Sequence, residues 1–184
     1  MISSEAKPEF IREILLTAEQ IQLRVKELSS EIAEKYRGQH LLLVGVLKGA
    51  FILTADLCRE LHRAGLTDLE IDFMTISSYD DKIESSRNPR FTKDVDANVS
   101  GRRVLLIEDI IETGYSLAAL QAIFLARGVA SLETLVLLSK PHKREIEVPV
   151  EYIGFEVREW VEGMGLDTNQ SGRANPDIVK VTKI

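Results

Sequence analysis

Residues 103–116 read RVLLIEDIIETGYS, and this stretch decides the fold. Its apolar run at 104–107 predicts a buried strand, and the following residues at 117–127 predict a helix. Two carboxylates, Glu108 and Asp109, come directly after the predicted strand. In an open α/β sheet, ligands bind beyond the carboxyl ends of the strands, so the turn between this strand and helix lies where a site is expected.

The turn carries two kinds of chemistry. Glu108 and Asp109 can accept hydrogen bonds from sugar hydroxyls. The hydroxyls of Thr113 and Ser116, the backbone N–H groups around Gly114 and the helix N-terminus can hold a phosphate. The pattern therefore predicts one site for a ribose and its phosphate. The string alone also fits a plain strand–loop–helix connection with solvated acids.

Strands and helices alternate along the rest of the chain. Thr17 and Gln20 predict a capping box for a helix that extends to Gly38. The other apolar runs predict a helix at 50–63 and strands at 10–16, 41–46, 69–76, 131–138, 150–157 and 178–182. This order predicts a single α/β domain over 1–184, with a mainly parallel central sheet flanked by helices. Residues 77–100 are polar and lack periodicity, which predicts a mobile loop.

The composition excludes several classes of function. The net charge of −6 argues against a general binder of nucleic acid or of anionic membranes. A single cysteine, Cys58, permits no internal disulfide and supports no cysteine-based zinc site, and we expect it to be buried and inert. No apolar run approaches 18 residues, and the N-terminus lacks the apolar segment of a signal peptide. A cytoplasmic protein without a membrane partner is expected.

The stretch at 103–116 resembles the phosphoribosyl-pyrophosphate (PRPP) binding motif of the type I phosphoribosyltransferases. It is closest to the hypoxanthine-guanine phosphoribosyltransferase form, V-L-I-V-E-D-I-I-D-T-G-x-T. It departs from this form at Glu112, where the family has an aspartate that is the proposed general base, and at Ser116, which keeps the hydroxyl of the family threonine. The resemblance implies the type I phosphoribosyltransferase fold, with a small hood built from about 1–16 and 157–184.

Two further stretches resemble parts of the family that contact PRPP. Leu47-Lys48-Gly49 resembles a loop that touches pyrophosphate and often holds a cis peptide bond. Ser77-Ser78-Tyr79 resembles the start of a mobile loop that closes over PRPP, so Ser78 and Tyr79 are implied to bind it. Each stretch alone also fits an ordinary turn or surface loop.

The remaining matches concern the base, the metal and the pyrophosphate. Lys140 matches the family lysine that donates to O6 of a purine. Trp160 stands where the family stacks Phe or Tyr on the base, although the chain is one residue shorter there, and a core tryptophan is the alternative. Val161 would present backbone groups to the purine, Asp167 would help hold Mg²⁺, and Arg173 would bind pyrophosphate. Glu108 and Asp109 are possible indirect partners of the metal.

The resemblance implies transfer of ribose 5-phosphate from PRPP to N9 of hypoxanthine or guanine, giving IMP or GMP and pyrophosphate, with Mg²⁺ as cofactor. Glu112 would manage the proton on N7, and Thr113, Gly114, Tyr115 and Ser116 would cradle the 5′-phosphate. A homodimer or homotetramer is implied, with small-molecule substrates as the other partners. Two alternatives remain: a regulator that senses PRPP or nucleotides on the same fold, and a phosphoribosyltransferase for xanthine.

Overall fold

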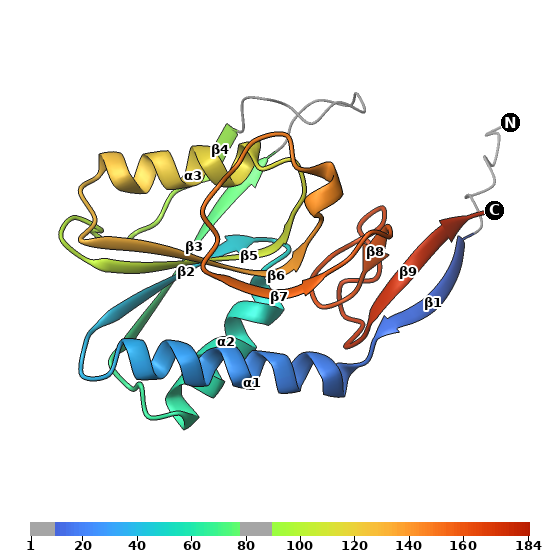
Figure 1. Ribbon diagram of the computed structural model, residues 1–184. Helices are drawn as coiled ribbons and strands as arrows, with labels where there is room; N and C mark the ends of the chain where they lie inside the picture. The colour runs from blue at the N-terminus through green and yellow to red at the C-terminus, as the bar shows by residue number, and fades with distance from the viewer. Residues whose placement is uncertain (1–9, 78–89) are drawn as a thin grey trace, which may run out of the picture.

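The computed structural model describes residues 10–77 and 90–184. Its centre is a six-stranded sheet in the order β4-β3-β2-β5-β6-β7 (Figure 1). The strands are β2 (Leu41–Leu47), β3 (Leu69–Ser77), β4 (Arg90–Lys93), β5 (Arg103–Ile111), β6 (Ser131–Ser139) and β7 (Tyr152–Glu156). All neighbouring pairs are parallel except β3 and β4, which are antiparallel. The predicted fold class, an α/β domain with a mainly parallel sheet, is therefore confirmed.

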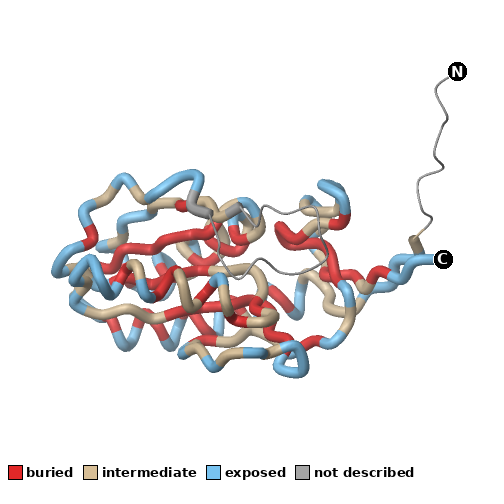
Figure 2. The backbone as a smooth tube through the Cα atoms, turned by 90° about the horizontal axis from the view of Figure 1, so that it is seen from above, coloured by how far each residue is buried: buried red, intermediate tan, exposed pale blue. Residues whose placement is uncertain are grey.

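Helices cover both faces of the sheet, which explains why β2 and residues 104–107 of β5 are apolar and buried. Figure 1 shows α1 (Ala18–Lys35) and α2 (Phe51–Arg63) on one face and α3 (Tyr115–Ala126) on the other. Because side chains alternate along a strand, Leu41 and Leu43 of β2 join the core under α1 and α2, while Leu42 and Val44 join the core under α3. Figure 2 shows the resulting buried segments in the interior of the molecule.

A second sheet of three strands forms the expected hood beside the main domain (Figure 1). It contains β1 (Phe10–Leu16), β8 (Val161–Glu162) and β9 (Ile178–Lys183), in the order β1-β9-β8, and all pairs are antiparallel. The predicted capping box is present at the start of α1, where Thr17 and Gln20 exchange hydrogen bonds. This cap fixes the point where the chain leaves the hood strand β1 and enters the main domain.

The structure corrects three sequence expectations. β5 does not end at Ile107 but pairs with β6 as far as Ile111, so Glu108 and Asp109 lie within the strand. β7 begins at Tyr152 rather than at 150. Cys58 is half-buried, not fully buried, and packs at the edge of the core. Polar residues usually end a buried strand, which is why the sequence predicts an end before Glu108. In the structure, Glu108 and Asp109 continue the strand and face a cavity.

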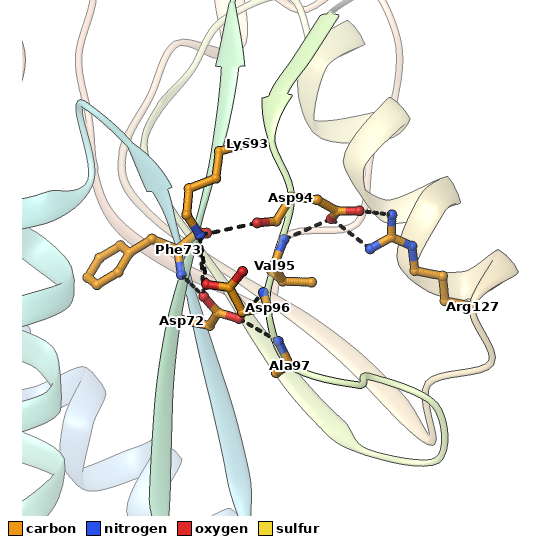
Figure 3. Close-up of polar contacts among 8 residues, drawn as sticks. All are labelled: Asp72, Phe73, Lys93, Asp94, Val95, Asp96, Ala97 and Arg127. Atoms are coloured by element: carbon orange, nitrogen blue, oxygen red, sulfur yellow. Dashed lines mark hydrogen bonds and ion pairs between the residues drawn. The ribbon is translucent and has the colours of Figure 1, made fainter.

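Residues 90–100 of the predicted loop begin with a short strand, β4, and continue as a chain segment with defined contacts. β4 pairs with β3, and the chain after it is held by two carboxylates (Figure 3). Asp72 of β3 accepts from the backbone N–H groups of Asp96 at 2.7 Å and Ala97 at 2.9 Å. Asp94 pairs with both terminal nitrogens of Arg127, at 2.8 and 2.6 Å, just after α3. Ser78 and Tyr79, which were expected to bind PRPP, lie outside the described residues.

Candidate functional site

A cavity of about 460 Å³ lies at the carboxyl ends of β2 and β5. It brings together most of the predicted site residues: Lys48, Gly49, Glu108, Asp109, Glu112, Thr113, Gly114, Ser116, Asp167 and Arg173. Tyr115, Lys140, Trp160 and Val161 do not line it. The predicted position of the site, beyond the strand ends of the sheet, agrees with the place of this cavity.

Glu108 and Asp109 form an acidic pair in the wall of the cavity. Burial raises the pKa of Glu108 well above its usual range, and the neighbouring charge of Asp109 raises it further. Burial also raises the pKa of Asp109, although the Ile110 N–H, which donates to its Oδ1 at 2.8 Å, and the charge of Arg173 oppose the shift. Hydroxyl donors or a cation would stabilise the ionised form of these two buried carboxylates. A ligand with several hydroxyl groups, bound together with a metal ion, supplies hydroxyl donors and a cation.

Glycines bring the backbone of three segments together beside the acidic pair. A Cβ atom on Gly49 would lie 1.6 Å from Oδ2 of Asp109, so a larger residue there would displace this carboxylate. A Cβ atom on Gly165 would lie 1.8 Å from the carbonyl oxygen of Gly49. Arg173 donates to the carbonyl oxygen of Gly165 at 2.7 Å and pairs with Asp167 at 2.5 Å. The loop after β2, the end of β5 and the segment after β8 therefore form one close contact.

The turn after β5 is shaped to receive an anion. Gly114 lies at the N-cap of α3 with φ +98°, and because it is a glycine it has no side chain to cap the helix. The backbone of the segment after β6 holds the turn in place, because the N–H groups of Glu145 and Ile146 donate to the carbonyl oxygen of Thr113 at 3.0 and 3.2 Å. The positive end of the α3 dipole is directed at this turn, and a phosphate is the ligand that such a helix start favours. The Leu47–Lys48 peptide bond, whose residues also line the cavity, is cis, as the resemblance implied.

Glu112 is paired with two lysines at the edge of the cavity. Its Oε1 accepts from Lys140 at 2.6 Å, and Lys143 lies 3.2 Å from both Oε1 and Oε2. Partial burial raises the pKa of Glu112, but the hydrogen bonds and charges of Lys140 and Lys143 outweigh it, so the pKa lies below its usual value. Lys140 is buried, with 3% of its surface exposed, so its pairing with a carboxylate is needed on physical grounds.

The comparisons with known proteins agree with this geometry. A family model described as the phosphoribosyl transferase domain matches residues 12–169. The hypoxanthine phosphoribosyltransferase of Escherichia coli K12 is 41% identical over 172 residues, 92% of this chain and 94% of the relative. The hypoxanthine-guanine phosphoribosyltransferase of Bacillus subtilis 168 is 40% identical over 91% of this chain and 92% of the relative.

A solved structure gives the same result. A hypoxanthine phosphoribosyltransferase from Staphylococcus aureus superposes with a TM-score of 0.86 at 37% identity, covering 92% of this chain and 91% of that one. This chain belongs to the phosphoribosyl transferase domain family.

In this phosphoribosyl transferase domain, Trp160 is not a core residue. It is 55% exposed, and its ring meets the ring of Phe10 edge-on, with 6.3 Å between the centroids. The core alternative for the only tryptophan is therefore wrong, and an aromatic surface remains open for a ligand. Val161, next along the chain, is buried and pairs with Lys180 between β8 and β9. The hood thus presents Trp160 on a strand start that is fixed by backbone pairing.

Sequence reasoning missed three residues near the site. Gly165 was not singled out, because a glycine's close packing against a distant backbone leaves no local signal. Lys143 and Arg144 were also missed, although the basic run His142-Lys143-Arg144 after Lys140 was a visible signal. Arg144 donates from Nε to the carbonyl oxygen of Glu112 at 2.9 Å, so this run contacts both ends of the residue at which the chain departs from its family.

Among the described residues, no helix is both long and apolar enough to span a membrane. Across residues 10–77 and 90–184, no three His, Cys, Asp or Glu side chains converge on a point where they alone would hold a metal ion.

Proposed function

We propose that this protein transfers ribose 5-phosphate from PRPP to N9 of hypoxanthine or guanine, giving IMP or GMP and pyrophosphate in purine salvage. The observation that carries the proposal is the cavity, which is lined by an acidic pair, an anion-binding turn and Glu112, with Lys140 paired to Glu112 at its edge. These three features match the ribose, the 5′-phosphate and the purine. The similarity to hypoxanthine phosphoribosyltransferases over nearly the whole chain supports the same assignment.

The PRPP half of the cavity is assigned as follows. Glu108 and Asp109 accept hydrogen bonds from the ribose 2′- and 3′-hydroxyls. The turn at 113–116 binds the 5′-phosphate through its backbone N–H groups, its hydroxyls and the dipole of α3. Lys48, Gly49 and Arg173, which also line the cavity, bind the pyrophosphate.

The base binds at the edge formed by Glu112 and Lys140. Lys140 donates to O6, Glu112 accepts the proton of N7, Trp160 stacks on the ring and Val161 offers backbone groups. As N9 forms its bond to C1′ and the bond from C1′ to pyrophosphate breaks, N7–H becomes more acidic and its proton passes to the Glu112 carboxylate. The rest of the rate enhancement comes from holding N9 in line with C1′ and from negative charge near a cation-like sugar.

Mg²⁺ fits the residues that face the cavity. Burial raises the pKa values of Glu108 and Asp109, and the charge of Asp109 raises that of Glu108 further. A divalent cation nearby favours the ionised form of both carboxylates. Asp167, which lies in the cavity wall, offers an oxygen ligand, with Glu108 and Asp109 acting indirectly. When bound, the metal supplies positive charge that neutralises the leaving pyrophosphate.

The test is an assay that measures nucleotide formation by the purified protein with PRPP and either hypoxanthine or guanine. We expect IMP or GMP to form when Mg²⁺ is present, and we expect this activity to be lost when the metal is chelated. Formation of neither nucleotide at any Mg²⁺ concentration would exclude the proposed reaction.

Two further measurements test the proposed assembly and location. Sedimentation of the purified protein tests the proposed homodimer or homotetramer, and fractionation of the source cells tests the proposed cytoplasmic location.

A further inference from the structure

Lys143 contacts the carboxylate of Glu112, and the proposed reaction assigns no role to this contact. It ends the short 3₁₀ helix η1 (Pro141–Lys143), which follows β6. Its ammonium nitrogen lies 3.2 Å from each carboxylate oxygen of Glu112, whereas Lys140 hydrogen-bonds only to Oε1, at 2.6 Å. Lys143 thus contacts both oxygens of the carboxylate, whereas Lys140 contacts only one of them.

The two lysines are not equivalent once a base is bound. The proposed reaction requires Lys140 to donate to O6 of the purine, and the same ammonium now donates to Glu112. A purine that places O6 on Lys140 and N7 on Glu112 inserts its edge between these two groups and weakens their contact. Glu112 is partly buried, so losing its cation there would favour its protonated form, which cannot accept the N7 proton.

We propose that Lys143 is a positioning residue that keeps the Glu112 carboxylate ionised and directed at N7 while Lys140 contacts the purine O6. The inference rests on the proposed function. Glu112 has one more rotatable bond than the aspartate expected at this position, so its carboxylate needs an additional anchor to occupy a single place. A contact to both of its oxygens supplies that anchor.

The backbone around Lys143 is fixed, which distinguishes it from a freely moving surface lysine. Its N–H donates to the carbonyl oxygen of Lys140 at 3.0 Å, and the N–H of Arg144 donates to that of Pro141 at 3.1 Å. Within residues 10–77 and 90–184, the charged groups that contact Glu112 are Lys140 just after β6, Lys143 in η1, and Arg144, whose guanidinium contacts the backbone oxygen rather than the carboxylate. Lys143 is therefore the second cation on the Glu112 carboxylate, beside Lys140.

The experiment compares Lys143→Met and Lys143→Arg with wild type, and uses Lys26→Met as a matched control. Lys26 is an exposed lysine on α1, so its loss changes the net charge equally and far from the cavity. We expect Lys143→Met to lower kcat for IMP formation about tenfold, a fraction of what a positioned proton acceptor contributes. The KM for PRPP and the melting temperature should stay close to wild type, because the side chain of Lys143 is half-exposed.

The pH dependence gives a readout that a structural role would not change. The charges of Lys140 and Lys143 depress the pKa of Glu112. Removing one of them raises that pKa, so the acid limb of the kcat profile should move to higher pH in Lys143→Met, return in Lys143→Arg and stay in place in Lys26→Met. Carbon-13 NMR of the glutamate carboxyl groups should show the same shift directly, with the Glu112 signal assigned by its loss in Glu112→Gln.

The outcomes separate the two proposals. An active wild type whose kcat, acid limb and Glu112 titration are all unchanged in Lys143→Met would overturn the role of Lys143 and leave the reaction standing. Loss of activity that Lys143→Arg does not restore, with an unchanged Glu112 titration, would also overturn it. A wild type that forms no nucleotide would overturn the proposed function itself.

Discussion

Glu112 replaces the proposed general base of the family that this chain resembles, so substituting it gives the most direct test of the chemistry. Glu112→Gln keeps the size of the side chain but cannot accept the N7 proton. We expect kcat to fall by about 10²–10⁴, with little change in PRPP binding. Glu112→Asp should be tolerated or faster, because it restores the family residue.

The competing interpretation is that Glu112 only complements the dipole at the start of α3, worth about 0.3–1 kcal/mol. In that case the Gln variant would lose a little stability and keep its rate. Measuring kcat and the melting temperature for both variants separates the two interpretations, and a fully active Gln variant would remove Glu112 from the mechanism.

Asp109 is expected to serve the ligand at some cost to the fold. Its pKa is raised in the folded protein, so its charge destabilises the fold once the pH exceeds the unfolded value of about 4. Asp109→Asn removes that charge and can still accept from the Ile110 N–H. The variant should therefore melt no lower than wild type at neutral pH, while its kcat/KM for PRPP falls.

The pH sign of this effect can be checked separately. For an acid whose folded pKa is raised, stability is fully present below the unfolded pKa and is lost as the pH rises toward the folded one. The stability difference between Asp109→Asn and wild type should accordingly shrink in acid. A large drop in melting temperature with unchanged kinetics would instead identify Asp109 as a structural carboxylate.

At the scale of elements, the contact between the hood segment and the loop after β2 depends on Gly165. It has φ +101°, and a Cβ atom there would lie 1.8 Å from the Gly49 carbonyl oxygen. Gly65 is a matched control, because its φ is +94° and nothing lies within 4 Å of a Cβ atom placed on it. Gly65→Ala should cost only the left-handed backbone strain, about 1–2 kcal/mol.

Gly165→Ala should cost a further 1–3 kcal/mol, roughly the price of overpacking, and should also lower activity because Gly49 lies against Asp109. Chemical denaturation of both variants measures the difference, and PRPP kinetics measure the effect on the cavity. Equal destabilisation by the two substitutions would show that the hood segment moves freely away from the loop.

The elements also show what sequence reasoning can reach. Apolar runs located the central strands, because those strands are buried on both faces and need no polar residues. The same rule misplaced the end of β5, since Glu108 and Asp109 continue the strand toward a cavity rather than toward water. β4 was missed because its four residues pair at the sheet edge, where the chain after them is held by Asp72 and Arg127 rather than by its own apolar pattern.

At the scale of the whole molecule, the candidate site draws on segments that are far apart in the chain. The PRPP motif and the phosphate turn are local, so sequence alone predicted them. The contact between Glu112 and Lys143 arises only when the sheet brings β5 and β6 side by side, and the contact between Gly49 and Gly165 only when the segment after β8 packs on the loop after β2. No spacing along the chain records such contacts, and this is why sequence reasoning missed Gly165 and Lys143, whereas the residues of the PRPP motif could be proposed from the sequence.

The choice of base follows from how the whole site is charged. Lys140 is a buried donor and Glu112 an ionised acceptor, so the site suits a purine with an acceptor at C6 and a proton on N7. Adenine presents a 6-amino donor to Lys140, which leaves two donors facing each other without an acceptor. Because buried unpaired polar groups are costly, we expect kcat/KM for adenine to be at least ~100-fold below that for hypoxanthine.

Lys140→Met should remove most of this discrimination by lowering the rate with hypoxanthine far more than the rate with adenine, since Lys143 still holds Glu112. Competition assays with hypoxanthine, guanine, xanthine and adenine measure the ratios in both proteins. Efficient formation of AMP by the wild type, or an unchanged hypoxanthine-to-adenine ratio in the variant, would show that the base is selected by a group other than Lys140.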